Sequence, residues 1–206
     1  MRSAGSVDHR VGWVVRAAAC VALGAAVVAA APASRRESEL LKQKVALINA
    51  HAEHPTRQGR RTTVTEGEVN SYLQYDAGTQ IPAGVVEPSV SILGAGRLSG
   101  RAVVDLDAVR KAKNATSFWD PMSYLTGRLP VTATGTLKTA NGTAQFILDT
   151  AAIAGVPIPK IVLQEIVSYY SRTPANPSGI GLDDPFALPS RIREIQVERG
   201  QAIIIQ

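Results

Sequence analysis

Apolar residues recur at intervals of three and four over residues 36–53, which is the spacing of one face of a helix. The segment opens with capping-box spacing at Ser34-Arg-Arg-Glu37, and Pro55 follows its end. We therefore predict a helix over residues 36–53. Residues 56–63 lack this period and contain several arginines, so they are predicted to form an exposed basic loop.

Two further helices are predicted downstream. A second capping box, Thr65-Glu-Gly-Glu68, opens a helix that ends near Tyr75 and has Tyr72 and Leu73 on its apolar face. Pro159 is suited to the first turn of a helix that extends to Ser171. The polar residues of this helix form a narrow stripe, namely Lys160, Gln164, Ser168 and Ser171. Most of its remaining circumference is apolar: Ile158, Ile161, Val162, Leu163, Ile166, Val167, Tyr169 and Tyr170. One core cannot cover so wide a surface, so we expect this helix to be sandwiched or to line a cavity.

Alternation with a period of two predicts short strands between and after these helices. Six are expected, at residues 85–93, 98–107, 129–139, 143–153, 192–198 and 202–206. Asn141-Gly142 is a strong hairpin signal between two of them, and a short polar helix is expected over 108–113. Helices at both ends of an antiparallel meander define an α+β fold, with two to three helices packed on about six strands.

The N-terminus has the layout of an export signal. Arg2 and Arg10 precede an alanine-rich apolar stretch that ends in Ala31-Pro-Ala33, where small residues suit signal peptidase. We predict that residues 1–33 form a signal peptide and that residues 34–206 form one extracytoplasmic, periplasmic domain. The alternative is an uncleaved inner-membrane anchor over residues 11–33, with the domain outside. The single cysteine, Cys20, lies in this segment, which leaves the exported domain without a thiol or a disulfide.

Charge excludes one class of partner. The chain has a formal net charge of +5, but the predicted signal contains three arginines and one aspartate, which leaves 19 basic and 16 acidic residues. So small an excess slightly favours an anionic membrane surface and is far from the basic stripe of a nucleic-acid binder. The low aromatic content, 5%, also argues against a platform for stacking bases.

Two groups of residues suggest chemistry and have simpler explanations. His51, Glu53 and His54 resemble zinc ligands in type, but they cannot all face one site at the end of a helix, and no other histidine or cysteine follows. Asp105 and Asp107 have the spacing of paired carboxylates on the outer face of a strand, where solvent exposure explains them equally well. No nucleophile elbow or phosphate-binding loop is present. We predict no catalytic residue, no metal site and no cofactor.

Three segments in order resemble bacterial envelope proteins of the YpmS and LmeA-like kind. They are Val64-Thr-Glu-Gly-Glu-Val-Asn70-Ser-Tyr-Leu73, then Asn141-Gly142 with Gly155-Val-Pro-Ile-Pro159 and its apolar helix, then Leu188-Pro189 before Ile192-Arg-Glu-Ile-Gln-Val197. The resemblance implies a curved antiparallel sheet wrapped around a helix, as in tubular lipid-binding modules. Ser190-Arg191 departs from the glycine expected between Leu-Pro and the last strand pair.

The leading hypothesis is therefore an envelope module that binds or transfers phospholipid or another apolar ligand. Its predicted apolar lining comprises Ile158, Ile161, Val162, Ile166, Tyr169, Tyr170, Tyr72 and Leu73. The second hypothesis is an envelope assembly or scaffolding protein, whose apolar helix meets a protein partner. The third is a hydrolase that uses Asp105 or Asp107.

Overall fold

The computed structural model describes residues 33–56, 58–112, 127–172 and 176–206, apart from five side chains, those of Thr79, Arg110, Ala112, Tyr169 and Tyr170. The predicted signal lies outside this range except for Ala33. No helix in the described ranges has both the length and the hydrophobicity needed to cross a membrane.

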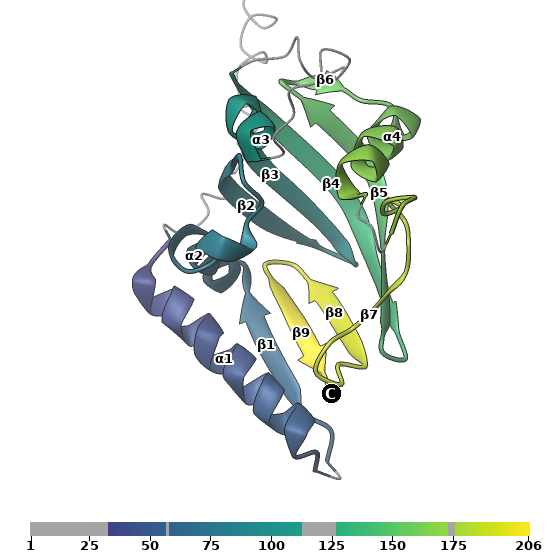
Figure 1. Cartoon of the computed structure of the whole chain (residues 1–206). Helices are drawn as coiled ribbons and strands as arrows, with labels where there is room; N and C mark the ends of the chain where they lie inside the picture. Colours follow the sequence, from purple (N-terminus) through teal and green to yellow (C-terminus); the bar gives the residue numbers. More distant parts are fainter. Residues whose placement is uncertain (1–32, 57, 113–126, 173–175) are drawn as a thin grey trace, which may run out of the picture. The chain divides into compact units, whose positions relative to one another are not determined.

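The α+β class is confirmed, and the larger of two antiparallel sheets contains the predicted meander (Figure 1). Its strand order is β2-β3-β4-β5-β6, and the short β7 also pairs with β5. The strands are β2 (Val85–Gly94), β3 (Arg97–Asp105), β4 (Arg128–Ala140), β5 (Thr143–Ile153), β6 (Val156–Pro157) and β7 (Phe186–Ala187). The hairpin between β4 and β5 turns at Asn141-Gly142, both at positive φ, as the sequence predicts.

The strand register gives the large sheet one apolar and one polar face. Pairs such as Leu98 with Gly135 and Ala102 with Val131 put small and apolar residues on one face. The intervening pair, Arg101 with Thr132, lies on the opposite, polar face. The alternation in the sequence therefore reports the two faces correctly, because side chains of an extended strand point to alternate sides.

A second sheet has the order β1-β9-β8, with strands β1 (Arg61–Thr65), β8 (Glu194–Glu198) and β9 (Gln201–Ile205). The predicted closing hairpin thus lies outside the large sheet. The predicted loop over residues 56–63 is wrong at its end, because Arg61 already begins β1. Thr62 and Val64 are buried while their neighbours are exposed or half-buried, and the partner strand β9 lies more than a hundred residues away in sequence.

The described helices are α1 (Arg35–Glu53), α2 (Glu66–Tyr75), α3 (Leu106–Ala112), α4 (Lys160–Ser171) and a 3-10 turn, η1 (Gly78–Gln80). The strand predicted to reach Asp107 ends at Asp105, because the Asp105 carboxylate accepts the Ala108 N–H at 3.0 Å and starts α3. The helix predicted after Pro159 is confirmed as α4.

Side chains of α2 cover the open edge of β2. The Asn70 side-chain amide accepts the Val90 N–H at 2.7 Å and donates to the Val90 carbonyl at 2.9 Å, as a neighbouring strand would. The Glu66 carboxylate accepts the Ile92 N–H at 2.6 Å. Where β4 meets the second sheet, the Thr139 hydroxyl likewise accepts the Ile195 N–H of β8 and donates to the Ile195 carbonyl. Each sheet thus has an edge closed by a side chain rather than left free for aggregation.

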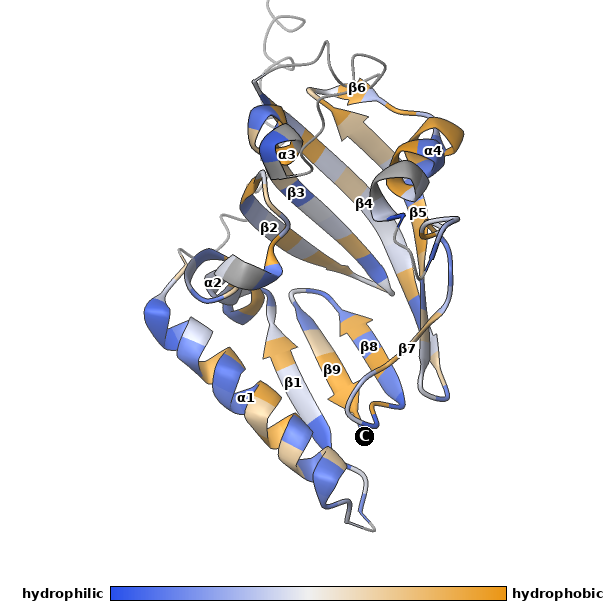
Figure 2. Cartoon of the chain, in the orientation of Figure 1, coloured by the Kyte–Doolittle hydropathy of each residue, from blue (hydrophilic) through white to orange (hydrophobic). Residues whose placement is uncertain are grey.

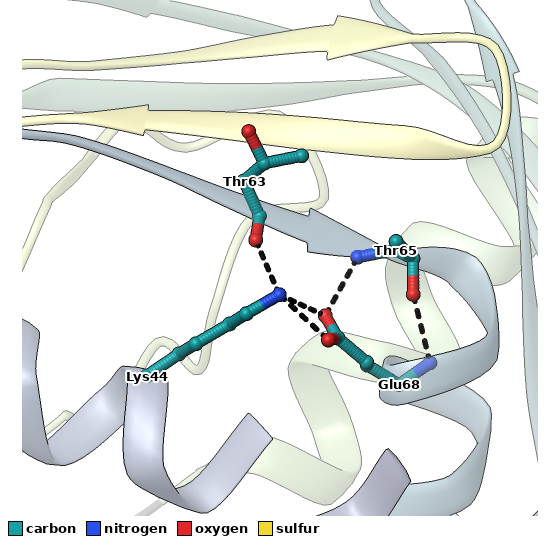
Figure 3. A network of polar contacts seen from close by, with 4 residues as sticks. All are labelled: Lys44, Thr63, Thr65 and Glu68. Atoms are coloured by element: carbon teal, nitrogen blue, oxygen red, sulfur yellow. Dashed lines mark hydrogen bonds and ion pairs between the residues drawn. The ribbon is translucent and has the colours of Figure 1, made fainter. Parts of the chain in front are cut away.

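Helix α1 is joined to α2 by a partly buried ion pair (Figure 3). Lys44 Nζ lies 2.6 and 2.7 Å from the two carboxylate oxygens of Glu68 and donates to the Thr63 carbonyl at 2.7 Å. Glu68 also accepts the Thr65 N–H at 3.0 Å, which completes the predicted capping box. One carboxylate therefore caps α2 and fixes α1 against it.

Candidate functional site

The polar side chains of α4 form hydrogen bonds with a later segment of the chain, residues 179–184. The Gln164 side chain accepts the Leu182 N–H at 2.7 Å and donates to the Ile180 carbonyl at 3.3 Å. The Ser171 hydroxyl accepts the Ile180 N–H at 2.7 Å, and Lys160 pairs with Asp183. The side chains that a surface helix usually turns to water are here used to hold the backbone of residues 179–184.

Gly179 allows this close approach. A Cβ built at Gly179 would lie 2.1 Å from the Ser168 carbonyl oxygen, and its φ is +76°. A larger residue would therefore push the segment away from α4 in addition to adopting an unfavourable backbone conformation. The segment also reaches β5, where the Asp183 carboxylate accepts the Leu148 N–H at 3.3 Å.

Apolar side chains of α4 are left on the outside. Ile161 is 74% exposed and Val162 is 45% exposed, and Val156 in the adjoining β6 is 62% exposed. Figure 2 shows strongly hydrophobic positions on both α4 and β6. We name Val156, Ile161 and Val162 the α4 apolar surface. Two apolar side chains of α4 thus face solvent, although Leu163, Ile166 and Val167 of the same helix are half-buried, as on the inner side of an ordinary surface helix.

The remaining predicted residues of this helix are only partly covered. Ile158 and Ile166 are half-buried, and Ile158 donates its N–H to the Ala151 carbonyl of β5 at 2.9 Å. The side chains of Tyr169 and Tyr170 lie outside the described part of the structure. The expectation that the helix is sandwiched is wrong for Ile161 and Val162, because residues 179–184 take its polar side and leave these two side chains in solvent.

Tyr72 and Leu73 lie elsewhere. Their helix, α2, packs on β2, whereas α4 lies beside β5, with β3 and β4 between the two strands (Figure 1). Leu73 lines a pocket of about 750 Å³ between the end of α2 and residues 78–89, together with Ile81 and Val85. The Tyr72 hydroxyl accepts a hydrogen bond from Gln80 at 3.0 Å at the same end of α2. The predicted lining therefore divides into two separate places.

Asp105 and Asp107 have structural partners. Arg128 Nε lies 3.2 Å from the Asp105 carboxylate, which also caps α3, and Asp107 accepts the Gly127 N–H at 3.2 Å. The pKa of Asp105 is lowered, first by the Ala108 N–H and next by Arg128. A carboxylate held ionised in this way is suited to capping and poorly suited to act as a general acid. The premise that both residues lie on the outer face of a strand is wrong, since Asp107 belongs to α3.

The histidine group gives no metal site in the described residues, where no cluster of three His, Cys, Asp or Glu side chains is found. His51 lies in the last turn of α1 and His54 is its C-cap. Sequence reasoning missed the Lys44–Glu68 pair and the bonds of Asn70. The capping box predicted only that the Glu68 side chain folds back onto the start of α2.

Comparison of the chain with models of protein families, with curated proteins and with solved structures found no match. A functional assignment therefore depends on the chemistry of α4 and of the pockets.

Proposed function

We propose that residues 34–206 form a non-catalytic, extracytoplasmic module of the bacterial cell envelope that binds phospholipid or another apolar ligand through the α4 apolar surface. The observation that carries this proposal is the exposure of apolar side chains on α4 and the adjoining β6. The hydrogen-bonding side chains of α4 are satisfied by residues 179–184, and Ile161 and Val162 face solvent. Contact of these side chains with acyl chains removes apolar surface from water and is therefore favourable.

The free energy gained when these side chains move from water into lipid shows how strongly they can contribute to membrane binding. Full transfer of a Val or Ile side chain from water to an apolar phase is worth about 1.5–3 kcal/mol. Two such side chains together provide about 3–6 kcal/mol, which is less than a myristoyl chain provides, and a myristoyl chain alone binds a membrane only weakly and reversibly. The pocket beside Leu73 offers an additional concave wall with apolar residues, the kind of surface on which such ligands settle.

The test compares charged substitutions at equally exposed sites on two helices. Val162→Asp and Ile161→Asp should leave the circular dichroism spectrum unchanged, because both side chains already contact water. They should reduce binding to phosphatidylcholine vesicles, and the phospholipid recovered with the purified chain, by about tenfold or more, since a carboxylate is expelled from hydrocarbon. Leu47→Asp on α1, where Leu47 is 47% exposed against 45% for Val162, is the matched control and should bind as the parent does.

Other outcomes discriminate between the hypotheses. Folded Val162→Asp protein that retains its phospholipid would contradict the proposal. Lipid-free parent protein that loses a stoichiometric envelope protein on the same substitution would instead favour the assembly or scaffolding role, because the same apolar surface suits a protein partner.

A further inference from the structure

A second pocket, of about 470 Å³, lies where the end of α1 meets the turn between β4 and β5 and the segment before β8. Its lining includes two arginines, Arg191 and Arg193, as well as His51 and the amide of Asn141. No Asp or Glu is among the described residues that line it. The described lining is therefore rich in hydrogen-bond donors and contains no Asp or Glu side chain, and the Gln206 main-chain oxygen accepts one of these donors, from Arg193.

Arg193 is held in place from three directions. Its N–H donates to the Ile205 carbonyl at 2.8 Å, and its own carbonyl accepts the Gly142 N–H at 2.9 Å. Its guanidinium donates through Nη2 to the Gln206 carbonyl at 2.7 Å. A Cβ at Gly59 would lie 2.9 Å from Nη2, so only a glycine there leaves this head group its present position. The other guanidinium N–H groups of Arg193 have no carboxylate partner in the described chain.

Arg191 is placed at a conformational cost. Ser190 and Arg191 have φ of +52° and +54°, a region that glycine adopts far more readily than other residues. Hydrogen bonds on either side maintain this backbone conformation. The Ser190 carbonyl accepts a hydrogen bond from Gln206 Nε2 at 2.7 Å, and the Ile192 N–H donates to the Pro189 carbonyl at 3.0 Å. The Arg191 side chain makes no hydrogen bond or ion pair with the described residues. A non-glycine residue at positive φ can mark a functional position, and no described residue bonds the guanidinium of Arg191.

We propose that this pocket binds a phosphate group, with the guanidinium groups of Arg191 and Arg193 as its principal ligands. Planar guanidinium groups donate two parallel hydrogen bonds to phosphate oxygens, which makes arginine pairs suited to this anion. The pocket is open to a free phosphate and to the head group of a phospholipid alike. The proposal depends on the contacts of this pocket and not on the α4 apolar surface.

The test uses a substitution that removes the charge and relieves the strain together. Arg191→Gly should leave the melting temperature unchanged or raise it, because glycine accepts the positive φ. It should weaken binding of inorganic phosphate to the full chain, measured by isothermal titration calorimetry, by at least about tenfold, since a bond between charged groups is lost. Arg191→Lys, which keeps the charge and loses the two parallel donors, should bind phosphate more weakly than the parent and more tightly than Arg191→Gly. Arg101→Gln, which removes an exposed arginine from the polar face of β3, is the control and should bind phosphate as the parent does.

The source of the phosphate is identified with vesicles. If Arg191→Gly also reduces binding to vesicles of phosphatidylcholine with added phosphatidylglycerol more than to phosphatidylcholine alone, the ligand is an anionic head group. If only phosphate binding falls, the ligand is a free phosphate compound, and the pocket is equally supported. Parent protein that binds no phosphate, or Arg191→Gly and Arg101→Gln proteins that bind it as the parent does, would overturn the proposal. Loss of vesicle binding in Val162→Asp with phosphate binding intact separates failure at one site from failure at the other.

Discussion

Single polar side chains stand in for missing backbone partners at several joints of the fold. Asn70 bonds both the N–H and the carbonyl of Val90, and Thr139 does the same for Ile195. Gln206 donates to the Ile48 carbonyl at 2.9 Å and to the Ser190 carbonyl, so it joins α1 to the segment before β8. Each of these bonds joins segments distant in sequence, and the fold depends on them because a buried backbone group without a partner is costly.

We predict that Asn70→Leu lowers the free energy of unfolding by about 2 kcal/mol, because it leaves the N–H and carbonyl of Val90 without partners at a partly buried edge. Urea denaturation of the folded chain measures the change. Gln74→Leu, an exposed position on the same helix, is the control and should stay within about 0.5 kcal/mol. Equal effects of the two substitutions would show that the amide bonds at Val90 add nothing beyond helix propensity.

Local signals determined what could be predicted at the scale of residues. The capping box at Thr65 and Glu68 and the turn at Asn141-Gly142 are formed by neighbours in sequence, and both are confirmed. The bonds of Asn70, twenty residues from Val90, and of Thr139, further still from Ile195, have no local signature. Ser190-Arg191 was predicted in part. The sequence showed that glycine is absent from this turn, and the structure shows that both residues adopt positive φ there.

At the scale of elements, α1 is attached to α2 through polar groups as much as through its apolar side. The Lys44–Glu68 pair lies at the centre of this contact, with Glu68 only 7% exposed and Lys44 28% exposed at their side chains. A second set of bonds lies at the start of α1, where the Ser71 hydroxyl accepts the Ser34 N–H at 3.0 Å and donates to the Glu37 carboxylate at 3.0 Å. Both serine and glutamate positions are fixed by these bonds, so the register of α1 on α2 is specific.

We predict that Lys44→Met lowers the free energy of unfolding by about 2–3 kcal/mol, because it leaves the buried Glu68 carboxylate without its cation. Lys42→Met on the same helix removes two ion pairs nearer to solvent, with Glu39 and with Asp76, and should have a much smaller effect. Urea denaturation of the two variants gives the comparison. A double variant, Lys44→Met with Glu68→Leu, should recover part of the loss; failure to recover would mean that the cap on α2 matters more than the ion pair.

The way that elements pack on one another explains why the candidate site was only partly predicted. The apolar width of α4 was evident from its sequence, but the direction of its polar stripe depends on residues 179–184, which have no periodic pattern and follow the helix. β1 was missed for a related reason: five residues between a basic loop and a capping box become a strand because β9 pairs with them. Tertiary pairing overrode local propensity in both cases.

At the scale of the whole molecule, three aspartate carboxylates join segments far apart along the chain. Asp76 bonds Ser38 and Lys42 of α1, Asp105 bonds Arg128 of β4, and Asp183 bonds Lys160 of α4. The pKa of Asp76 is lowered first by the Ser38 hydroxyl and then by Lys42, and the pKa of Asp183 is lowered first by Lys160. The fold therefore has three contacts between distant segments that require an ionised aspartate.

We predict that the melting temperature falls in acid and is flat near neutrality. Each of these aspartates has a folded pKa below its ordinary value of 3.8, so the stability it contributes is fully present above that value and is lost as the pH falls through the lower, folded pKa. Lys42, whose pKa is raised mainly by Glu39 and Asp76, has the opposite sign: its contribution is present below 10.5 and is lost as the pH rises through the higher, folded pKa. Differential scanning fluorimetry of the parent and of the Asp76→Asn, Asp183→Asn double variant across this range measures the effect. The variant should melt lower than the parent at neutral pH and lose less on acidification, because its amides no longer titrate; an acid limb of equal depth in both proteins would assign the transition to other groups.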